Sequence, residues 1–86
     1  MELSQMSKAR IRLLIYPIQF DPDPSMSIEH VIECVVQKDH FISIAEFAAS
    51  IHEGLDSETQ LSLLIPQPHS EVVIRSFLSK LLDQIT

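Results

Sequence analysis

The chain has 86 residues, of which 45% are hydrophobic and only one is glycine, and this composition favours a folded domain over a disordered tail. Twelve acidic residues against six basic ones give a net charge of −6, which argues against nucleic-acid binding because phosphate contacts need clustered Lys and Arg. No apolar run approaches the roughly 20 residues that span a bilayer. A single cysteine, Cys34, excludes an internal disulfide framework and favours a cytoplasmic location.

The N-terminal residues have no basic-then-apolar signal pattern. We expect residues 1–8 to form a flexible leader and residues 9–86 to form a single domain. A domain of this size buries only roughly 60–65% of its unfolded surface, so its margin of stability is small.

The first predicted element is a strand at Arg10–Tyr16. Polar and apolar residues alternate through most of it, which places Ile11, Leu13 and Ile15 on one face. Pro17 lacks a backbone N–H and ends the strand.

A proline-rich loop leads to a helix predicted from about Ser27 to Lys38. Its apolar residues recur every three or four positions and form one stripe: Ile28, Val31, Ile32, Val35 and Val36. Because β-branched residues are poor helix formers, a strand at Val31–Val36 is the alternative.

The next helix has the clearest start signal. Ser43 and Glu46 have the spacing of a capping box, in which each side chain accepts a hydrogen bond from a free backbone N–H. We expect this helix to end at Gly54, where a left-handed cap is least costly.

A second strand is predicted at Leu61–Ile65, followed by Pro66. The last helix is predicted to start near Ser70, with Glu71 in its first turn. Its apolar stripe consists of Ile74, Phe77, Leu78, Leu81, Leu82 and Ile85.

These elements predict an α/β (or α+β) fold in the order β-α-α-β-α. The sequence favours a short, parallel, two-stranded sheet packed on three helices. Such a sheet is almost all edge, and we expect a partner or a second copy to complete it.

The carboxyl ends of parallel strands are a common place for ligand sites, and here they would gather Asp21, Asp23 and His69. These residue types can do acid–base chemistry. We expect a partner-binding surface instead, because proline-stiffened loops lose little entropy on association.

Four acids follow the second helix and its exit: Glu46, Glu53, Asp56 and Glu58. They form either a solvated face or an acidic patch for a basic partner. His30 and Cys34 have a spacing that suits two metal ligands, but no third ligand is evident. We therefore predict no metal, no cofactor and no enzymatic activity.

The segment from Phe41 through Glu46-Phe47-Ala48-Ala49 to Leu61–Ile65 and Phe77–Leu82 is loosely similar to the helix–strand–helix core of some toxin-immunity proteins. The resemblance covers about half of the chain. It implies a small bacterial inhibitor that binds a nuclease or similar toxin tightly, with acidic side chains imitating substrate phosphates.

The leading hypothesis is accordingly a non-enzymatic, acidic inhibitor or immunity-like protein that occludes a partner protein. The alternative is a homodimeric adaptor or subunit module that joins two copies through their sheet edges. A small enzyme or ligand-binding protein that uses Asp21, Asp23 and His69 is the third choice.

Overall fold

The computed structural model describes residues 3–39 and 41–86, and over these ranges it contains four α-helices and no strand. The α-helices are α1 (Gln5–Ile15), α2 (Ile28–Val31), α3 (Ile44–Asp56) and α4 (Glu71–Ile85). The shorter elements are the 3₁₀-helices η1 (Tyr16–Ile18), η2 (Pro24–Ser27) and η4 (Leu61–Leu63) and the π-helical turn η3 (Ile32–Val36). The predicted α/β fold, with its two-stranded sheet, is therefore wrong: the described chain is all-α.

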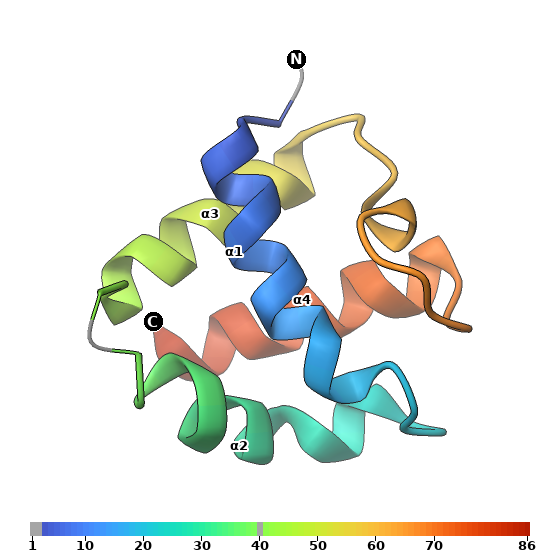
Figure 1. The fold of residues 1–86 in the computed structure, drawn as a ribbon, viewed down its shortest axis with the longest axis horizontal. Helices are drawn as coiled ribbons and strands as arrows, with labels where there is room; N and C mark the ends of the chain where they lie inside the picture. The colour runs from blue at the N-terminus through green and yellow to red at the C-terminus, as the bar shows by residue number, and fades with distance from the viewer. Residues whose placement is uncertain (1–2, 40) are drawn as a thin grey trace.

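The helices surround one hydrophobic core. In Figure 1, α1 crosses in front of α4, with α3 above the crossing and α2 below it. One cluster of buried side chains joins all four α-helices and the turns between them: Leu3, Ile11, Leu14, Ile15, Ile18, Ile28, Val31, Val36, Phe47, Ile51, Leu61, Ile74, Phe77, Leu78 and Leu81.

The predicted strand at Arg10–Tyr16 lies in α1 and at the start of η1. Its fully buried residues continue past the predicted strand with the i, i+3, i+4, i+7 spacing of a helix: Ile11, Leu14, Ile15 and Ile18. Leu13, which the alternation placed with Ile11, is half exposed. Seven residues are too few to distinguish the two-residue period of a strand from the 3.6-residue period of a helix, because Ile11 and Ile15 fit both patterns.

Residues 3–8, which we expected to be part of a flexible leader, contribute to the fold. Leu3 is buried in the core, and the Ser4 hydroxyl caps α1 by accepting a hydrogen bond from the Ser7 N–H at 3.2 Å. Residues 1 and 2 of that predicted leader lie outside the described residues.

The second predicted strand, Leu61–Ile65, is also wrong. Its first three residues form η4, and Leu61 alone among them is fully buried. The Glu71 carboxylate accepts hydrogen bonds from the backbone N–H groups of Leu61 and Ser62 at 3.0 and 2.8 Å. These N–H groups therefore have a side-chain acceptor where a strand would need a neighbouring strand.

The helix predicted at Ser27–Lys38 is present, but it is not regular. It begins as η2 and α2 and then widens into η3, where the Gln37 N–H donates to the carbonyl of Ile32, five residues back, at 2.8 Å. The alternative strand at Val31–Val36 is wrong.

The capping box of α3 is confirmed. The Glu46 N–H donates to the Ser43 hydroxyl at 3.1 Å, and the Ser43 N–H donates to the Glu46 carboxylate at 3.3 Å. The predicted end at Gly54 is wrong, because α3 continues to Asp56 and Gly54 has no left-handed backbone. A Cβ atom at Gly54 would lie 2.6 Å from Cδ1 of Ile11, so this glycine permits close approach of α1.

The last helix begins as predicted. The Ser70 hydroxyl accepts a hydrogen bond from the Val73 N–H at 3.3 Å, and Glu71 is the first residue of α4. Four members of the predicted apolar stripe are buried and the last two are partly buried: Ile74, Phe77, Leu78 and Leu81, then Leu82 and Ile85.

Candidate functional site

Two of the four acids predicted to form an acidic patch, Glu46 and Glu53, form contacts with α1. Glu46 pairs with the guanidinium of Arg10 at 2.9 Å, and Glu53 accepts a hydrogen bond from the Ser7 hydroxyl at 2.7 Å. Ser50, which is buried, links the two sides, since its hydroxyl oxygen lies 3.2 Å from Nη1 of Arg10 and 3.3 Å from Oγ of Ser7. We call these five residues the α1–α3 seam.

Hydrogen bonds from the seam and from the N-cap residues lower the pKa of both seam carboxylates. The Ser43 backbone N–H contributes most to holding the pKa of Glu46 below its ordinary value, with Arg10 contributing less. Hydrogen bonds from the Ser7 hydroxyl and then from the Ser4 N–H lower the pKa of Glu53. Both carboxylates thus hold helices together, and they are less available to a partner than the sequence suggested.

The other two patch acids remain at the surface. Asp56 Oδ2 lies 3.2 Å from Nδ1 of His52, and both side chains are largely exposed. Glu58 follows in the exposed link after α3. An exposed pair of this kind contributes little to stability, so these side chains are free to reorient towards a partner.

The three loop residues predicted to gather are each engaged in local structure. Asp21 accepts a hydrogen bond from the Ser27 hydroxyl, and Asp23 caps η2 by accepting from the hydroxyl and N–H of Ser25. Those two hydrogen bonds, the hydroxyl first, lower the pKa of Asp23.

His69 and Asp21 do meet, although not as a pair of reacting side chains. Nε2 of His69 lies 2.9 Å from the carbonyl oxygen of Ile18, and the backbone N–H of Asp21 donates to that same oxygen at 3.0 Å. A carbonyl only accepts, so Nε2 of His69 carries the proton of this hydrogen bond. Asp21, Asp23 and His69 therefore stabilise the turns around η1 and η2 through these hydrogen bonds.

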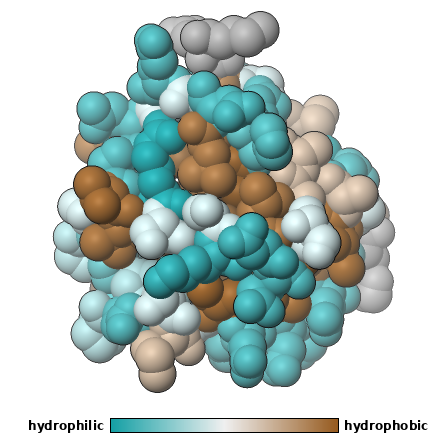
Figure 2. Space-filling view, turned by 180° about the vertical axis from the view of Figure 1, so that it is seen from behind, coloured by the Kyte–Doolittle hydropathy of each residue, from teal (hydrophilic) through white to brown (hydrophobic). Residues whose placement is uncertain are grey.

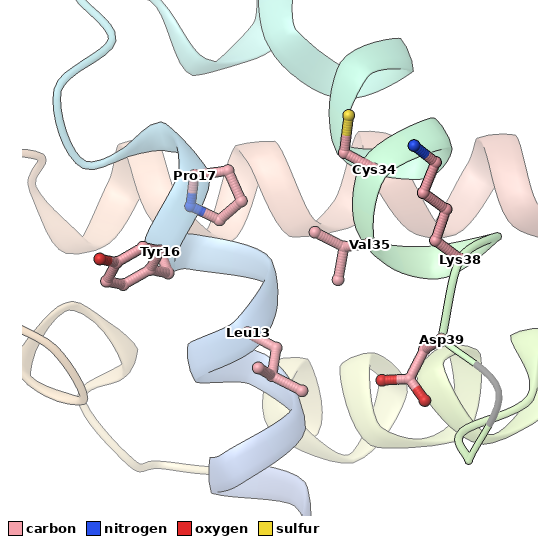
Figure 3. A pocket seen from close by; sticks show the side chains of 7 residues that line it. All are labelled: Leu13, Tyr16, Pro17, Cys34, Val35, Lys38 and Asp39. Atoms are coloured by element: carbon pink, nitrogen blue, oxygen red, sulfur yellow. The ribbon is translucent and has the colours of Figure 1, made fainter.

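A hollow lies elsewhere, between the end of α1 with η1 on one side and η3 on the other. Figure 3 shows its residues, which come from α1, η1, η3 and the turn after η3: Leu13, Tyr16, Pro17, Cys34, Val35, Lys38 and Asp39. We call it the α1–η3 groove. It has a volume of about 330 Å³, and Leu13 and Val35 point into it from opposite walls.

The π-helical turn shapes one wall of the groove. Cys34 and Val35 lie in the middle of η3. The Cys34 thiol is exposed and lies 3.6 Å from Nδ1 of His30, one turn earlier. Among the described residues no third His, Cys, Asp or Glu joins this pair in a group that could hold a metal ion.

Asp39 closes the groove towards α3. Its Oδ1 accepts hydrogen bonds from the N–H groups of Phe41 and Ile42, both at 2.8 Å. This turn leaves Phe41 with 94% of its surface exposed, directly after the rim of the groove. Phe20, in the loop after η1, is 89% exposed. Two of the four phenylalanines of the chain therefore take no part in the core.

A smaller hollow, of about 230 Å³, lies between η2 and α4. Asp23, Val73 and Lys80 are among its lining residues. On the face opposite to that of Figure 1, apolar surface is divided into several areas by hydrophilic side chains (Figure 2).

The comparisons with known proteins give no relationship. Neither the protein-family models, nor the curated proteins, nor the solved structures include a significant match to this chain. In the part of the chain that the structure describes, no helix has both the length and the apolar character needed to cross a bilayer.

The α1–η3 groove was missed by the sequence interpretation, although one signal for it exists. Once α1 is recognised as a helix, Leu13 and Tyr16 fall outside its buried stripe. Large apolar residues on the solvent side of an amphipathic helix are candidates for contact with another molecule. The widening of η3, which turns Cys34 and Val35 towards the groove, has no comparable signal in the sequence.

Proposed function

We propose that this protein is a non-enzymatic interaction module that binds another protein chain through the α1–η3 groove. The observation that carries the proposal is the grouping of accessible apolar side chains around a hollow. Leu13 lines it from α1 and Tyr16 from the start of η1, and Phe41 lies two residues after Asp39 at its rim. Single exposed apolar residues are ordinary on protein surfaces, whereas a hollowed apolar area is typical of a contact site.

The binding role is retained from the sequence hypotheses, but two of its details are corrected. The similarity to toxin-immunity proteins depended on a strand at Leu61–Ile65, and that segment holds the 3₁₀-helix η4. The immunity-protein identification is therefore dropped. The edge-to-edge homodimer also loses its basis, because residues 3–39 and 41–86 contain no strand to provide an edge.

The remaining parts of the proposal rest on chemistry. The loop residues considered for acid–base work, Asp21, Asp23 and His69, have hydrogen bonds that fix turns. This favours a structural role for them over catalysis. A cytoplasmic location is proposed because the thiol of Cys34 is exposed and unpaired, a state that a reducing compartment preserves.

Site-specific photo-crosslinking tests the proposal. Phe41, two residues after Asp39 of the groove, is replaced by p-benzoylphenylalanine, and a second variant carries the same replacement at Phe20, which is similarly exposed in the loop after η1. Neither phenylalanine lines the groove itself, so each probes a partner at its margin. Both are irradiated in lysate from the natural source of the protein. We expect one adduct from position 41 that is absent from position 20. Excess unlabelled wild-type protein should prevent it, whereas excess Leu13→Gln variant should not.

Two outcomes would contradict the proposal. Equal adducts from both positions, or competition by the Leu13→Gln variant as strong as by wild type, would show that the groove is not the contact surface. An adduct with twice the mass of the chain would identify the partner as a second copy and would replace binding to another protein by self-association.

A further inference from the structure

The connection between α3 and α4 is held in place mainly by two side chains of α4. Arg75 donates hydrogen bonds to the carbonyl oxygens of Leu55, Ser57 and Thr59 at 3.0, 3.1 and 2.9 Å. Its Nε also donates to Glu71 at 2.7 Å. One guanidinium thus satisfies three carbonyls at and beyond the end of α3, where a helix has no internal donors left.

Glu71 holds the next part of the same connection. Its two carboxylate oxygens accept the N–H groups of Leu61 and Ser62, at the start of η4. Burial alone would raise the pKa of Glu71, but these N–H groups and Arg75 outweigh it and lower the pKa, so the carboxylate is charged at neutral pH. Glu71 and Arg75, one helical turn apart, act together as a two-residue latch.

The apolar attachment of the connection is small by comparison. We call residues 57–64 the strap. Leu61 is the only one of them that is fully buried, and Leu64 packs against the core partly buried. The Cδ atoms of Leu61 lie 3.7 Å from the position of a Cβ atom on Gly54, next to Cδ1 of Ile11. Leu61 therefore covers the close contact between α1 and α3 at Gly54.

The far end of the strap has a tether from another helix. Nε of Arg12, on α1, donates to the Leu64 carbonyl at 2.9 Å. Between the two ends, the N–H groups of Leu63 and Leu64 donate only to carbonyls three residues back. Outside the latch, the Ser62 carbonyl also accepts from Nε2 of Gln67 at 2.9 Å, and the Thr59 hydroxyl accepts from the Leu3 N–H at 3.4 Å. Segments with few buried apolar contacts open at lower free energy than the core to which they attach.

We propose that the strap is a separately opening flap, closed by the Glu71–Arg75 latch, whose opening uncovers an apolar surface at the α1–α3 crossing. In the open state the α3 and α4 helices remain folded. The Leu61 side chain leaves its site against Ile11 and Gly54, and both Leu61 and that site become accessible. This device is independent of the α1–η3 groove, which shares no residue with it.

Amide hydrogen exchange, followed residue by residue with NMR, tests the proposal on the whole chain. The variant is Arg75→Met, which keeps an apolar stem and removes the donors. The control is Lys80→Met, on the same helix, because Lys80 lines the smaller hollow beside η2 and has no hydrogen bond or ion pair with the strap among the described residues. We expect the amides of Leu61 and Ser62 to exchange at least tenfold faster in the first variant. The amides of Ile51 and Leu78, inside α3 and α4, should change less than threefold, and the control should change neither pair.

The wild-type protein offers a second measurement that does not depend on the variant being folded. At low concentrations of urea, exchange at Leu61 and Ser62 should rise with a smaller urea dependence than exchange at Ile51 and Leu78, because local opening exposes less surface than global unfolding. Equal urea dependence at all four amides would show that the strap opens only when the molecule unfolds. Unchanged exchange at Leu61 and Ser62 in Arg75→Met would show that the latch does not hold it.

Discussion

The close contact between α1 and α3 leads to a test by a pair of substitutions. Gly54→Ala adds a Cβ atom that would lie 2.6 Å from Cδ1 of Ile11, a fully buried side chain. Ile11→Val removes that one carbon atom. The two substitutions should therefore interact strongly, although the residues are 43 positions apart in the sequence.

The magnitudes follow from the two effects of the alanine. Overpacking a dense core costs about 1–3 kcal/mol, whereas replacing a helical glycine by alanine gains up to about 1 kcal/mol. Gly54→Ala alone should lower the free energy of unfolding by about 0–2 kcal/mol. Ile11→Val alone should cost about 0.5–1.5 kcal/mol. In the Ile11→Val background the clash is gone, so Gly54→Ala should raise the free energy of unfolding.

Urea denaturation of the four proteins, followed by far-UV circular dichroism, gives the coupling free energy. We expect about 1–3 kcal/mol. Ala49→Gly, on the exposed side of α3, is the matched control and should be additive with Ile11→Val. A coupling within about 0.5 kcal/mol of zero would refute the close approach of α1 and α3 at Gly54, and with it the packing of the first helix.

Three further outcomes are expected. Ser43→Ala should lower the free energy of unfolding by about 0.5–2 kcal/mol and Ser43→Gly by less, because the cap hydroxyl is lost; equal losses would contradict the capping role. The pKa of Glu71 is lowered by folding, so its contribution is complete above the ordinary pKa of about 4.3 and disappears as the pH falls through the folded value. Glu71→Gln should therefore lose less stability than wild type on acidification, measured by denaturation at several pH values. Phe41→Ser and Phe20→Ser should change the free energy of unfolding by less than about 0.5 kcal/mol, whereas Phe47→Ala should cost about 3–5 kcal/mol; a large loss at Phe41 would place it in the core.

The elements that the sequence predicted correctly are helices whose first residues carry a recognisable capping signal. Ser43 with Glu46, and Ser70 with Glu71, mark the starts of α3 and α4, because a free N–H needs an acceptor at that position. The apolar stripes of these helices then follow from the 3.6-residue period. Both helices were placed from their own residues alone.

The two wrong predictions share a physical cause. Short apolar runs such as Arg10–Tyr16 and Leu61–Ile65 satisfy more than one period, so their structure is decided by contacts with distant residues. For η4 the deciding group is the Glu71 carboxylate, ten residues after Leu61. For α1 the evidence lay outside the run, in the cap at Ser4 and the buried Ile18. No rule for isolated segments includes such partners.

The candidate groove was harder to predict than the fold, because it is a property of two segments together. Leu13 and Val35 are separated by more than twenty positions, and neither shows from the sequence that it faces the other. For the predicted acids, the sequence suggested more exposure than the structure shows. Glu46 and Glu53 appeared solvent-facing in the sequence, but the serines and Arg10 that bind them lie on α1.

The π-helical turn has a consequence for insertions and deletions in this chain. A π turn contains one residue more than a regular α-helical turn, so removing one residue from Ile32–Val36 would restore an unbroken α-helix without disturbing what precedes it. Because the wide turn absorbs the extra residue, the side chains on either side of the deletion would keep nearly their present directions. The change would be confined to the wall of the groove that Cys34 and Val35 form, while the core positions of α1 stayed unchanged. The π turn is thus a point at which the deletion of a single codon would change the shape of the groove and leave the rest of the fold in place.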